Sequence, residues 1–262
     1  MQAMIFAAGL GTRLKPITDT MPKAMVRVGE KPLIEHTIER LKNAGCNHMV
    51  VNVHHFAPQI IDFLHKKDFG IEVQISDESA QLLDTGGGIK RALPFFDLQK
   101  PVLIHNVDIF SNVDLRYFYL SASSTDEIDA LLLVSNRHTK RYLIFNDDML
   151  LAGWINVETG EVKSPFQELK TFVAQQAEET KINFAKAGYR LCAFSGIHIL
   201  KSSALMALEI FPERFSIIDF YLRNIEKLRL KGFLKTDLEL IDVGKHETLQ
   251  CAEAWLKKSL TP

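Results

Sequence analysis

Cysteine and tryptophan are scarce in this chain of 262 residues, which contains three of the former and two of the latter. Cys46, Cys192 and Cys251 lie far apart and form no Cys-x-x-Cys pair. The sequence therefore predicts neither a disulfide framework nor a zinc site. We expect three reduced, mostly buried thiols, as is typical of a cytoplasmic protein.

The chain also lacks an excess of either charge and any long apolar run. Its 31 basic and 32 acidic side chains give a formal net charge of −1, so no global field points to nucleic acid or an anionic membrane as a partner. The apolar run at residues 3–8 is far shorter than a signal core or a membrane span, and it predicts a first strand instead. With 47% hydrophobic residues and no internal repeat or linker, residues 1–262 are expected to form a single soluble domain.

Two common nucleotide-binding motifs are missing from the segment that follows this first strand. Residues 9–23 read Gly-Leu-Gly-Thr-Arg-Leu-Lys-Pro-Ile-Thr-Asp-Thr-Met-Pro-Lys. A dinucleotide fingerprint needs a third glycine where Leu14 stands, and a P-loop needs a closing Gly-Lys-Ser/Thr. What the segment does offer is two glycines whose bare N–H groups can face an anion, with Arg13 and Lys23 to add positive charge. This combination indicates a nucleoside triphosphate site.

The same segment resembles the signature of the sugar-1-phosphate nucleotidyltransferase family, Gly-x-Gly-Thr-Arg followed by Pro, Thr and Pro-Lys. The residues in register with it are Gly9, Gly11, Thr12, Arg13, Pro16, Thr18, Pro22 and Lys23. An ordinary glycine turn would explain the two glycines but not the other six matches. In length and in the residues of its motifs, the chain is most similar to the short N-acetylmuramic acid 1-phosphate uridylyltransferases and to mannose-1-phosphate guanylyltransferase-like members.

The first half of the chain alternates between strand and helix patterns. A helix is predicted at residues 31–45, where Pro32 suits the first helical position and Gly45 the C-terminal cap. The further predictions are strands at 49–53, 71–75 and 102–105 and helices at 58–66 and up to residue 93. This rhythm predicts an α/β, Rossmann-like fold, with helices on both faces of a mixed, mainly parallel twisted sheet and the ligand at the carboxyl ends of the strands. The resemblance implies the GT-A type of this architecture.

From about residue 126 the pattern changes to short strands, predicted at 130–134, 142–145 and 151–155. They are expected to form antiparallel hairpins laid against the main sheet as a small sugar-side lobe. A strand at 191–200 and helices at 201–210, 216–230 and 246–257 follow. We expect residues 1–125 to bind the nucleotide and residues 126–262 to supply the sugar-binding half and the C-terminal helices, without a left-handed β-helix domain.

The reaction implied by the resemblance joins two phosphates, so a divalent cation, Mg²⁺, is expected to neutralise charge. Magnesium takes one or two protein carboxylates, which predicts isolated acids at strand ends. Asp108 follows the strand at 102–105 and Asp242 ends a short strand at 240–241. In the family these slots hold the metal-binding acids. The family usually has glycine before the first acid, whereas this chain has Val107. A β-branched residue adopts a positive φ only at a cost and would crowd a group that approaches the backbone, so the substitution is either harmless or alters the substrate-side wall.

A second glycine cluster, Leu-Asp-Thr-Gly-Gly-Gly at residues 83–88, resembles the stretch that marks the sugar 1-phosphate branch of the family. Three glycines before a helix would leave N–H groups open and let a base or sugar approach the backbone. For the nucleotide we expect contacts from Ala7, Ala8, Gly9, Gly11, Thr12, Arg13, Lys23, Thr85 and Gly86. For the sugar we expect Gly87, Asn106 and Gly196, although a strand glycine at 196 equally suits close packing. The base itself is left open.

The resemblance thus implies a Mg²⁺-assisted transfer of a nucleotidyl group from a nucleoside triphosphate to a sugar 1-phosphate. Arg13, Lys23 and Asp108 would be the catalytic residues, and Asp108 and Asp242 the metal ligands. Uridylyl transfer to an amino-sugar 1-phosphate such as N-acetylmuramic acid 1-phosphate is the favoured form, and mannose 1-phosphate guanylyl transfer is the alternative. A non-catalytic nucleotide-sugar-binding subunit is the alternative from another class.

Overall fold

The computed structural model describes residues 1–175 and 183–259. Its strands are β1 (Gln2–Phe6), β2 (Arg27–Val28), β3 (Lys31–Pro32), β4 (His48–Val53), β5 (Glu72–Asp77), β6 (Val102–Asn106), β7 (Ile109–Ser111), β8 (Ala130–Ser135), β9 (Arg141–Asn146), β10 (Leu151–Asn156), β11 (Val162–Lys163), β12 (Tyr189–Leu200), β13 (Leu230–Leu234) and β14 (Leu240–Asp242). Its α-helices are α1 (Leu33–Asn43), α2 (Ala57–Lys66), α3 (Asp84–Ala92), α4 (Leu115–Ser123), α5 (Gln167–Gln175), α6 (Ser202–Leu208), α7 (Ile217–Asn224) and α8 (His246–Ser259).

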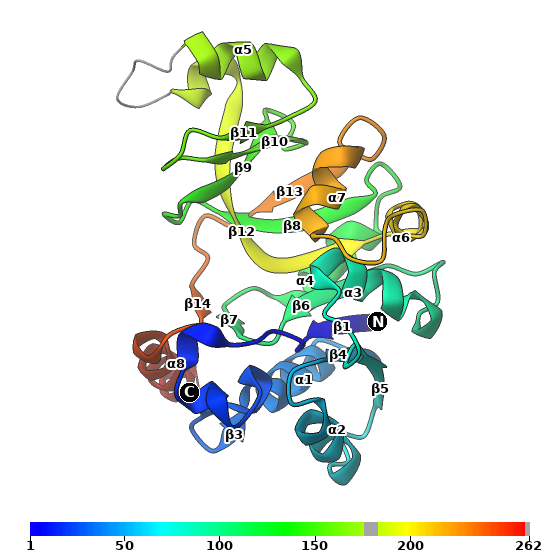
Figure 1. Ribbon diagram of the computed structural model, residues 1–262. Coiled ribbons are helices and arrows are strands. Elements are labelled where there is room, and N and C mark those ends of the chain that lie inside the picture. Colours follow the sequence, from blue (N-terminus) through cyan, green and yellow to red (C-terminus); the bar gives the residue numbers. More distant parts are fainter. Residues whose placement is uncertain (176–182, 260–262) are drawn as a thin grey trace.

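A mixed sheet organises the molecule (Figure 1). Strands β6, β1, β4 and β5 are parallel neighbours in that order, as the alternating pattern predicts. Successive side chains of β1 enter different cores: Ala3 and Ile5 pack on the face covered by α1 and α2, and Met4 packs on the face covered by α3, α6 and α7. Helices on both faces and a mainly parallel sheet core confirm the predicted fold class.

Strand β12 connects the sheet to the lobe. Its C-terminal part pairs with β6 and its N-terminal part pairs with β9, both antiparallel. Strands β9, β10 and β11 then form an antiparallel ribbon against which α5 packs through a small core of its own (Figure 1). The predicted lobe is therefore present, but it continues the main sheet instead of lying against it as separate hairpins.

Two predictions for the second half are wrong. The run at 130–134 is no lobe hairpin, because β8 lies in the main sheet between β12 and β13. The helix predicted at 216–230 ends at Asn224, and Leu230 begins β13, which runs parallel to β8. Apolar residues at helical spacing continue through Leu222, Ile225 and Leu228, so the local pattern alone does not reveal the break.

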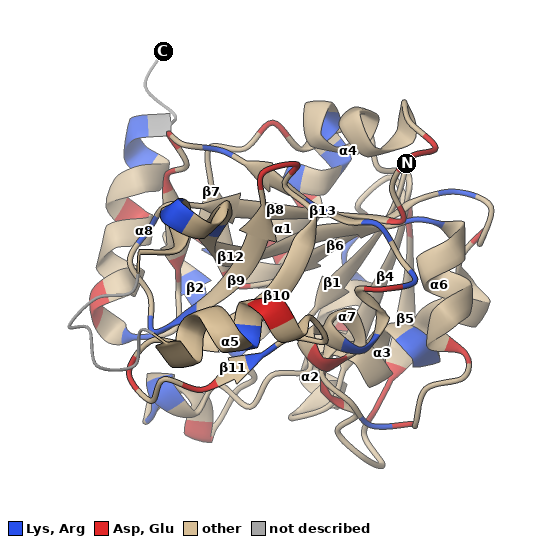
Figure 2. Cartoon of the chain, turned by 90° about the horizontal axis from the view of Figure 1, so that it is seen from above, with Lys and Arg blue, Asp and Glu red and all other residues tan. Residues whose placement is uncertain are grey.

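Charges and thiols match the composition-based expectations. Basic and acidic residues are interspersed over the elements, with neither sign gathered on one side (Figure 2). Cys46 and Cys192 are buried and Cys251 is exposed. Burial raises the pKa of the Cys46 and Cys192 thiols to about 11. Over the described ranges, every helix is too short or too polar to cross a bilayer.

Candidate active site

The glycine-rich loop begins where β1 ends. Gly11 adopts a left-handed φ of 64°, and a side chain there would press on Thr18 and Lys23. The Thr18 hydroxyl donates a hydrogen bond of 2.9 Å to the Gly11 carbonyl, which closes the loop. Around Gly9, by contrast, a Cβ atom would meet nothing within 4 Å. Gly11 therefore shapes the loop, whereas Gly9 leaves its backbone open.

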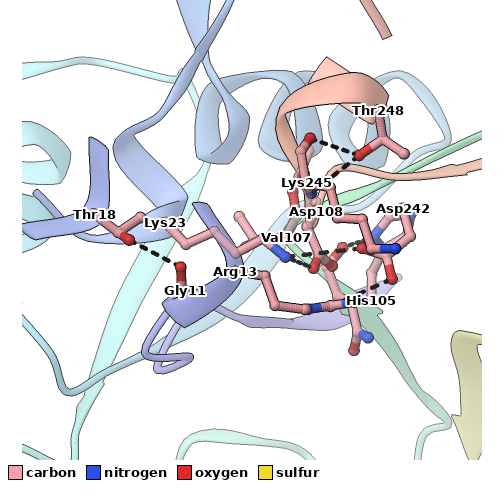
Figure 3. Close-up of polar contacts among 12 residues, drawn as sticks. Gly11, Arg13, Thr18, Lys23, His105, Val107, Asp108, Asp242, Lys245 and Thr248 are labelled. Carbon is pink, nitrogen blue, oxygen red and sulfur yellow. Dashed lines mark hydrogen bonds and ion pairs between the residues drawn. The ribbon is translucent and has the colours of Figure 1, made fainter. Parts of the chain in front are cut away.

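Two cations and two carboxylates meet beside this loop (Figure 3). Lys23 is 8% exposed, and its ammonium contacts the Asp108 carboxylate directly. The same ammonium lies 3.8 Å from Asp242, whose other oxygen lies 3.8 Å from the Arg13 guanidinium. Gly244 permits this arrangement, because a side chain there would collide with Arg13. The catalytic and metal-binding residues predicted from sequence thus lie together in one cluster.

A short ribbon brings the two acids together from distant parts of the chain. Strands β7 and β14 pair antiparallel, with Ile109 opposite Asp242. The Val243 amide donates a hydrogen bond of 2.9 Å to the Asp108 carbonyl. Asp108 precedes β7 and Asp242 ends β14, so the ribbon aligns their side chains at one edge.

Opposing effects act on the pKa of Asp108 in this cluster. Burial is the main cause that raises the pKa of Asp108, and the Asp242 charge acts in the same direction, whereas the Lys23 ammonium opposes both. The two carboxylates form an oxygen donor set suited to a hard cation, since Mg²⁺ needs only one or two protein carboxylates. In residues 1–175 and 183–259, no group of three or more histidine, cysteine or acidic side chains is arranged to hold a metal ion.

A buried polar network fixes the strand ends beneath the loop. Asn52, at the end of β4, accepts a hydrogen bond of 2.8 Å from the Ala7 amide and donates one of 2.7 Å to Glu78. The other Glu78 oxygen accepts from the Leu83 amide at 3.2 Å. Burial raises the pKa of Glu78, although these hydrogen bonds oppose the shift. The network joins the ends of β1, β4 and β5 into one support.

These groups surround a cavity of about 510 Å³. Predicted residues that line it are Ala7, Ala8, Gly9, Gly11, Thr12, Arg13, Lys23, Thr85, Asn106 and Asp108. Further residues in its lining are Phe6, Leu10, Asn52, Glu78, Leu82, Asp84, Val107, Arg214 and Gly244. The sequence gives a weak signal for Asn52 and Asp84, polar residues at a strand end and a helix start. It gives none for Arg214, which reaches the cavity from a distant loop.

The second glycine cluster has a different arrangement from the one predicted. Its glycines lie inside α3, and the amides of Gly86 and Gly87 both donate to the Phe215 carbonyl, at 2.9 and 3.2 Å. A Cβ atom on Gly86 would overlap the Phe215 ring, and one on Gly87 would overlap the Glu213 carbonyl. These amides are therefore not open to a base or sugar. The glycines instead let residues 213–216, including Arg214, dock against α3.

Gly196 lies in a bulge of β12, where the register with β8 shifts. Its φ is 74°, and a Cβ atom there would come within 2.5 Å of the Asn106 amide nitrogen. Asn106 lines the cavity, whereas Gly196 lies behind it. The packing interpretation of this glycine therefore fits the structure.

Val107 does not distort the site. Its backbone is not left-handed, its side chain is 5% exposed and it packs in the core with α1. Its amide donates to Phe6 at 3.1 Å, and its carbonyl accepts from the Thr37 hydroxyl at 3.1 Å. The backbone at Val107 is therefore unstrained, and Val107 forms part of the cavity wall beside Asp108.

A second cavity of about 500 Å³ opens between the lobe and α7. Cross-strand register places Leu143, Trp154 and Lys163 in one row and Arg141 beside Asn156, so these side chains share one face of the ribbon. The lining residues are Arg137, Thr139, Arg141, Tyr142, Leu143, Trp154, Asn156, Glu161, Lys163, Phe194, Ser216, Ile218, Asp219 and Leu222. Aromatic rings with polar and charged groups give a surface suited to a carbohydrate.

Known proteins are similar to this chain in sequence and in fold. Residues 2–153 match the family model described as Nucleotidyl transferase. The chain is 30% identical over 247 residues to D-glycero-alpha-D-manno-heptose 1-phosphate guanylyltransferase of Campylobacter jejuni, which covers 94% of this chain and 96% of that protein. It is 45% identical over 109 residues to N-acetylmuramate alpha-1-phosphate uridylyltransferase of Caulobacter vibrioides, which covers 40% of this chain.

That second match spans somewhat less than half of the Caulobacter protein, 45% of its length. Among solved structures, HddC from Yersinia pseudotuberculosis superposes with a TM-score of 0.73 at 23% identity, over 97% of this chain and 99% of that one. This likeness concerns the fold. Because the family model matches more than half of the chain and the Campylobacter relative matches nearly all of it, the chain belongs to the nucleotidyl transferase family.

Proposed function

We propose that the chain is a sugar-1-phosphate nucleotidyltransferase. The observation that carries this proposal is the convergence of Arg13, Lys23, Asp108 and Asp242 beside an open glycine loop, with the first three in the wall of one cavity. Cations beside bare amides suit a triphosphate, and paired carboxylates suit the cation that accompanies it. The aromatic, polar second cavity provides room for the acceptor sugar.

In the proposed reaction, an ionised oxygen of the sugar 1-phosphate attacks the α-phosphorus of the nucleoside triphosphate. A new P–O bond forms as the bond from the α-phosphorus to the bridging oxygen breaks, and pyrophosphate leaves with the electron pair. No side-chain nucleophile is needed, since the substrate supplies the attacking oxygen. Catalysis then consists of positioning and charge stabilisation.

Each residue of the cluster has a proposed task. The backbone of residues 9–12 and Arg13 hold the triphosphate, and Lys23 stabilises charge at the α-phosphate. Asp108 and Asp242 would hold Mg²⁺, which when bound would offset negative charge on the phosphates. The contact between Lys23 and Asp108 keeps both side chains extended toward the cavity before substrate enters.

The two halves of the chain have different proposed roles. Residues 1–125 supply the triphosphate loop, the buried network and Asp108. Residues 126–262 supply Asp242 and the second cavity, where we propose that the sugar binds. Asn106 is proposed to contact the sugar side, with Gly196 packing behind it.

For the substrates, we propose uridylyl transfer to N-acetylmuramate 1-phosphate, in keeping with the activity named for the Caulobacter relative. Guanylyl transfer to a mannose-type or heptose 1-phosphate is the second candidate, favoured by the match to the Campylobacter protein along almost its whole length. A non-catalytic binding subunit is less well supported, since Val107 leaves the cluster intact.

A matrix of UTP, GTP, CTP, ATP and dTTP against N-acetylmuramate 1-phosphate, mannose 1-phosphate and D-glycero-D-manno-heptose 1-phosphate tests these candidates. Pyrophosphate release and thermal stabilisation would be measured for each pair with Mg²⁺ present. Release with one pair supports the transferase and identifies the substrates. Thermal stabilisation without pyrophosphate from any pair would contradict the transferase and favour the binding subunit.

A further inference from the structure

The loop at residues 136–140, between β8 and β9, brings a cation to the second cavity. Arg137 lines this cavity, and its guanidinium donates a hydrogen bond of 2.8 Å to the Phe194 carbonyl of β12. In the described parts of the chain no carboxylate forms an ion pair with it. The backbone carbonyl anchors the side chain without neutralising its charge, so the remaining N–H groups are available to an anion.

The other cations near this cavity are placed differently. Arg141 also lines the cavity, but among the described residues its guanidinium has no hydrogen-bonding partner that anchors it. Lys163 pairs with Glu161 at 3.5 Å and lies 5.2 Å from the centre of the Trp154 ring. Lys140 is not part of the cavity lining and pairs with Glu158 at 2.8 Å. Lys23, in the first cavity, is already shared between two carboxylates. None of these side chains combines an unneutralised charge with an anchoring hydrogen bond inside the second cavity.

Contacts along β12 place Arg137 toward the first cavity. Its anchor, Phe194, is two residues from Gly196, which packs against Asn106, and Asn106 lines the first cavity. Burial lowers the pKa of Arg137 and the Asp242 charge opposes this shift, so Asp242 lies within electrostatic range of the guanidinium. Arg137 thus lines the second cavity at a point that β12 and Asn106 connect to the first cavity, and this point is the junction of the two cavities.

The proposed reaction requires an anion at this junction. The acceptor's phosphate must lie with its sugar in the second cavity and its oxygen directed into the first. A guanidinium can hold two oxygens of one phosphate at once and leave the third free to attack. We infer that Arg137 binds the phosphate of the sugar 1-phosphate and positions the attacking oxygen. This inference rests on the proposed function.

The test compares Arg137→Gln and Arg137→Lys with Lys140→Gln, which removes one positive charge from the same loop but outside the cavity. Losing a charged hydrogen-bonding partner should raise the KM for the sugar 1-phosphate about 10- to 100-fold in Arg137→Gln, with the KM for the nucleoside triphosphate within about twofold of wild type. Arg137→Lys should recover part of the loss. Lys140→Gln should match wild type. Equal KM values for the sugar 1-phosphate in Arg137→Gln and wild type, or a parallel rise in both KM values, would overturn the inference.

A binding measurement keeps this test separate from turnover. Calorimetric titration with N-acetylmuramate 1-phosphate and mannose 1-phosphate, each beside its parent sugar without phosphate, measures what the phosphate adds to affinity. Arg137→Gln should remove most of that increment and leave affinity for the parent sugar unchanged. An unchanged increment would overturn the role of Arg137 even in an active enzyme. Absence of pyrophosphate from the wild-type protein, with an increment that depends on Arg137, would instead overturn the proposed function alone.

Discussion

Lys23 illustrates how much of the site depends on single side chains. It is buried, and its charge is balanced by Asp108 with Asp242 nearby. Removing Lys23 would leave both carboxylates without their cation, which is costly, whereas Asp108→Asn keeps Asp242 as a partner of the ammonium. The sequence motif identifies this lysine, but only the fold shows that both acids reach it.

Asn52 has a comparable role beneath the glycine loop. Asn52→Ala would leave the Ala7 amide and Glu78 without their buried partner. Because buried unsatisfied polar groups are costly, the free energy of unfolding should fall by about 1–3 kcal/mol in urea denaturation. The KM for the nucleoside triphosphate should rise, since Asn52 also lines the cavity. Asn136→Ala, on the exposed loop, should change stability by less than about 0.5 kcal/mol. Equal stability of both variants would contradict the network's role.

His198 provides a pH-dependent test at the same scale. It is fully buried, its Nδ1 atom is 2.9 Å from the Tyr221 hydroxyl, and burial lowers its pKa to about 3. A group whose pKa is lowered by folding binds its proton mainly in the unfolded state. Its contribution to stability is thus full above pH 6.5, the ordinary histidine value, and is lost as pH falls toward 3.

Replacing this group should flatten the pH dependence of stability. Between pH 6 and pH 4.5, the wild-type free energy of unfolding should fall more steeply than that of His198→Gln, by up to about 1.4 kcal/mol per pH unit. Urea denaturation at several pH values gives both slopes. His138→Gln, in an exposed loop, serves as the control. Parallel slopes for wild type and His198→Gln would show that His198 titrates alike in both states.

At the scale of elements, α3 is distinguished by its three consecutive glycines. Two of them pack against the segment before α7: Gly86 contacts the Phe215 side chain, and Gly87 contacts the Glu213 backbone. The Ile217 amide also donates a hydrogen bond of 2.9 Å to the Thr85 hydroxyl. The motif therefore positions the segment that carries Arg214 to the first cavity.

Gly86 contacts a side chain whereas Gly87 contacts the backbone, so substitutions at these two glycines should couple differently to Phe215→Ala. Gly86→Ala and Gly87→Ala should each lower the melting temperature and raise the KM for the nucleoside triphosphate, because residues 213–216 must shift. Phe215→Ala should relieve the clash of Gly86→Ala but not that of Gly87→Ala, so only the first pair should couple, by about 1–2 kcal/mol. Double-mutant cycles of unfolding free energy measure this. Equal coupling for both glycines would contradict the assigned contacts.

At the scale of the whole molecule, the sequence predicts the first half of the fold better than the second. Strands β1, β4, β5 and β6 follow from local alternation, and α4 begins at a local signal of the same kind, since the Asp114 side chain caps it by accepting from the Tyr117 amide at 2.8 Å. In the second half, β8 and β13 pair across a long stretch of chain, and no local signal encodes such a pairing.

The candidate site shows the same division. The residues of the glycine loop form a contiguous motif, and their place in the cavity follows from β1. Asp108 and Asp242 come close together only through the β7–β14 ribbon. The packing role of the α3 glycines likewise depends on residues 213–215. Both partners lie far away in sequence, where periodicity carries no information. Arg137 stands in an ordinary polar loop, so only its anchor on Phe194 marks it.

We propose that the two cavities bring a nucleoside triphosphate and a sugar 1-phosphate together at Lys23, Asp108 and Asp242. This is tested by quantifying pyrophosphate and nucleotide-sugar from the same reaction, with UTP or GTP and each sugar 1-phosphate, for wild type and Asp108→Asn. We predict equimolar products from the wild type with one substrate pair, and a loss of at least about 1,000-fold in Asp108→Asn, whose melting temperature stays close to wild type. Turnover by Asp108→Asn at the wild-type rate under saturating Mg²⁺, or pyrophosphate without nucleotide-sugar, would rule out this reaction at these residues.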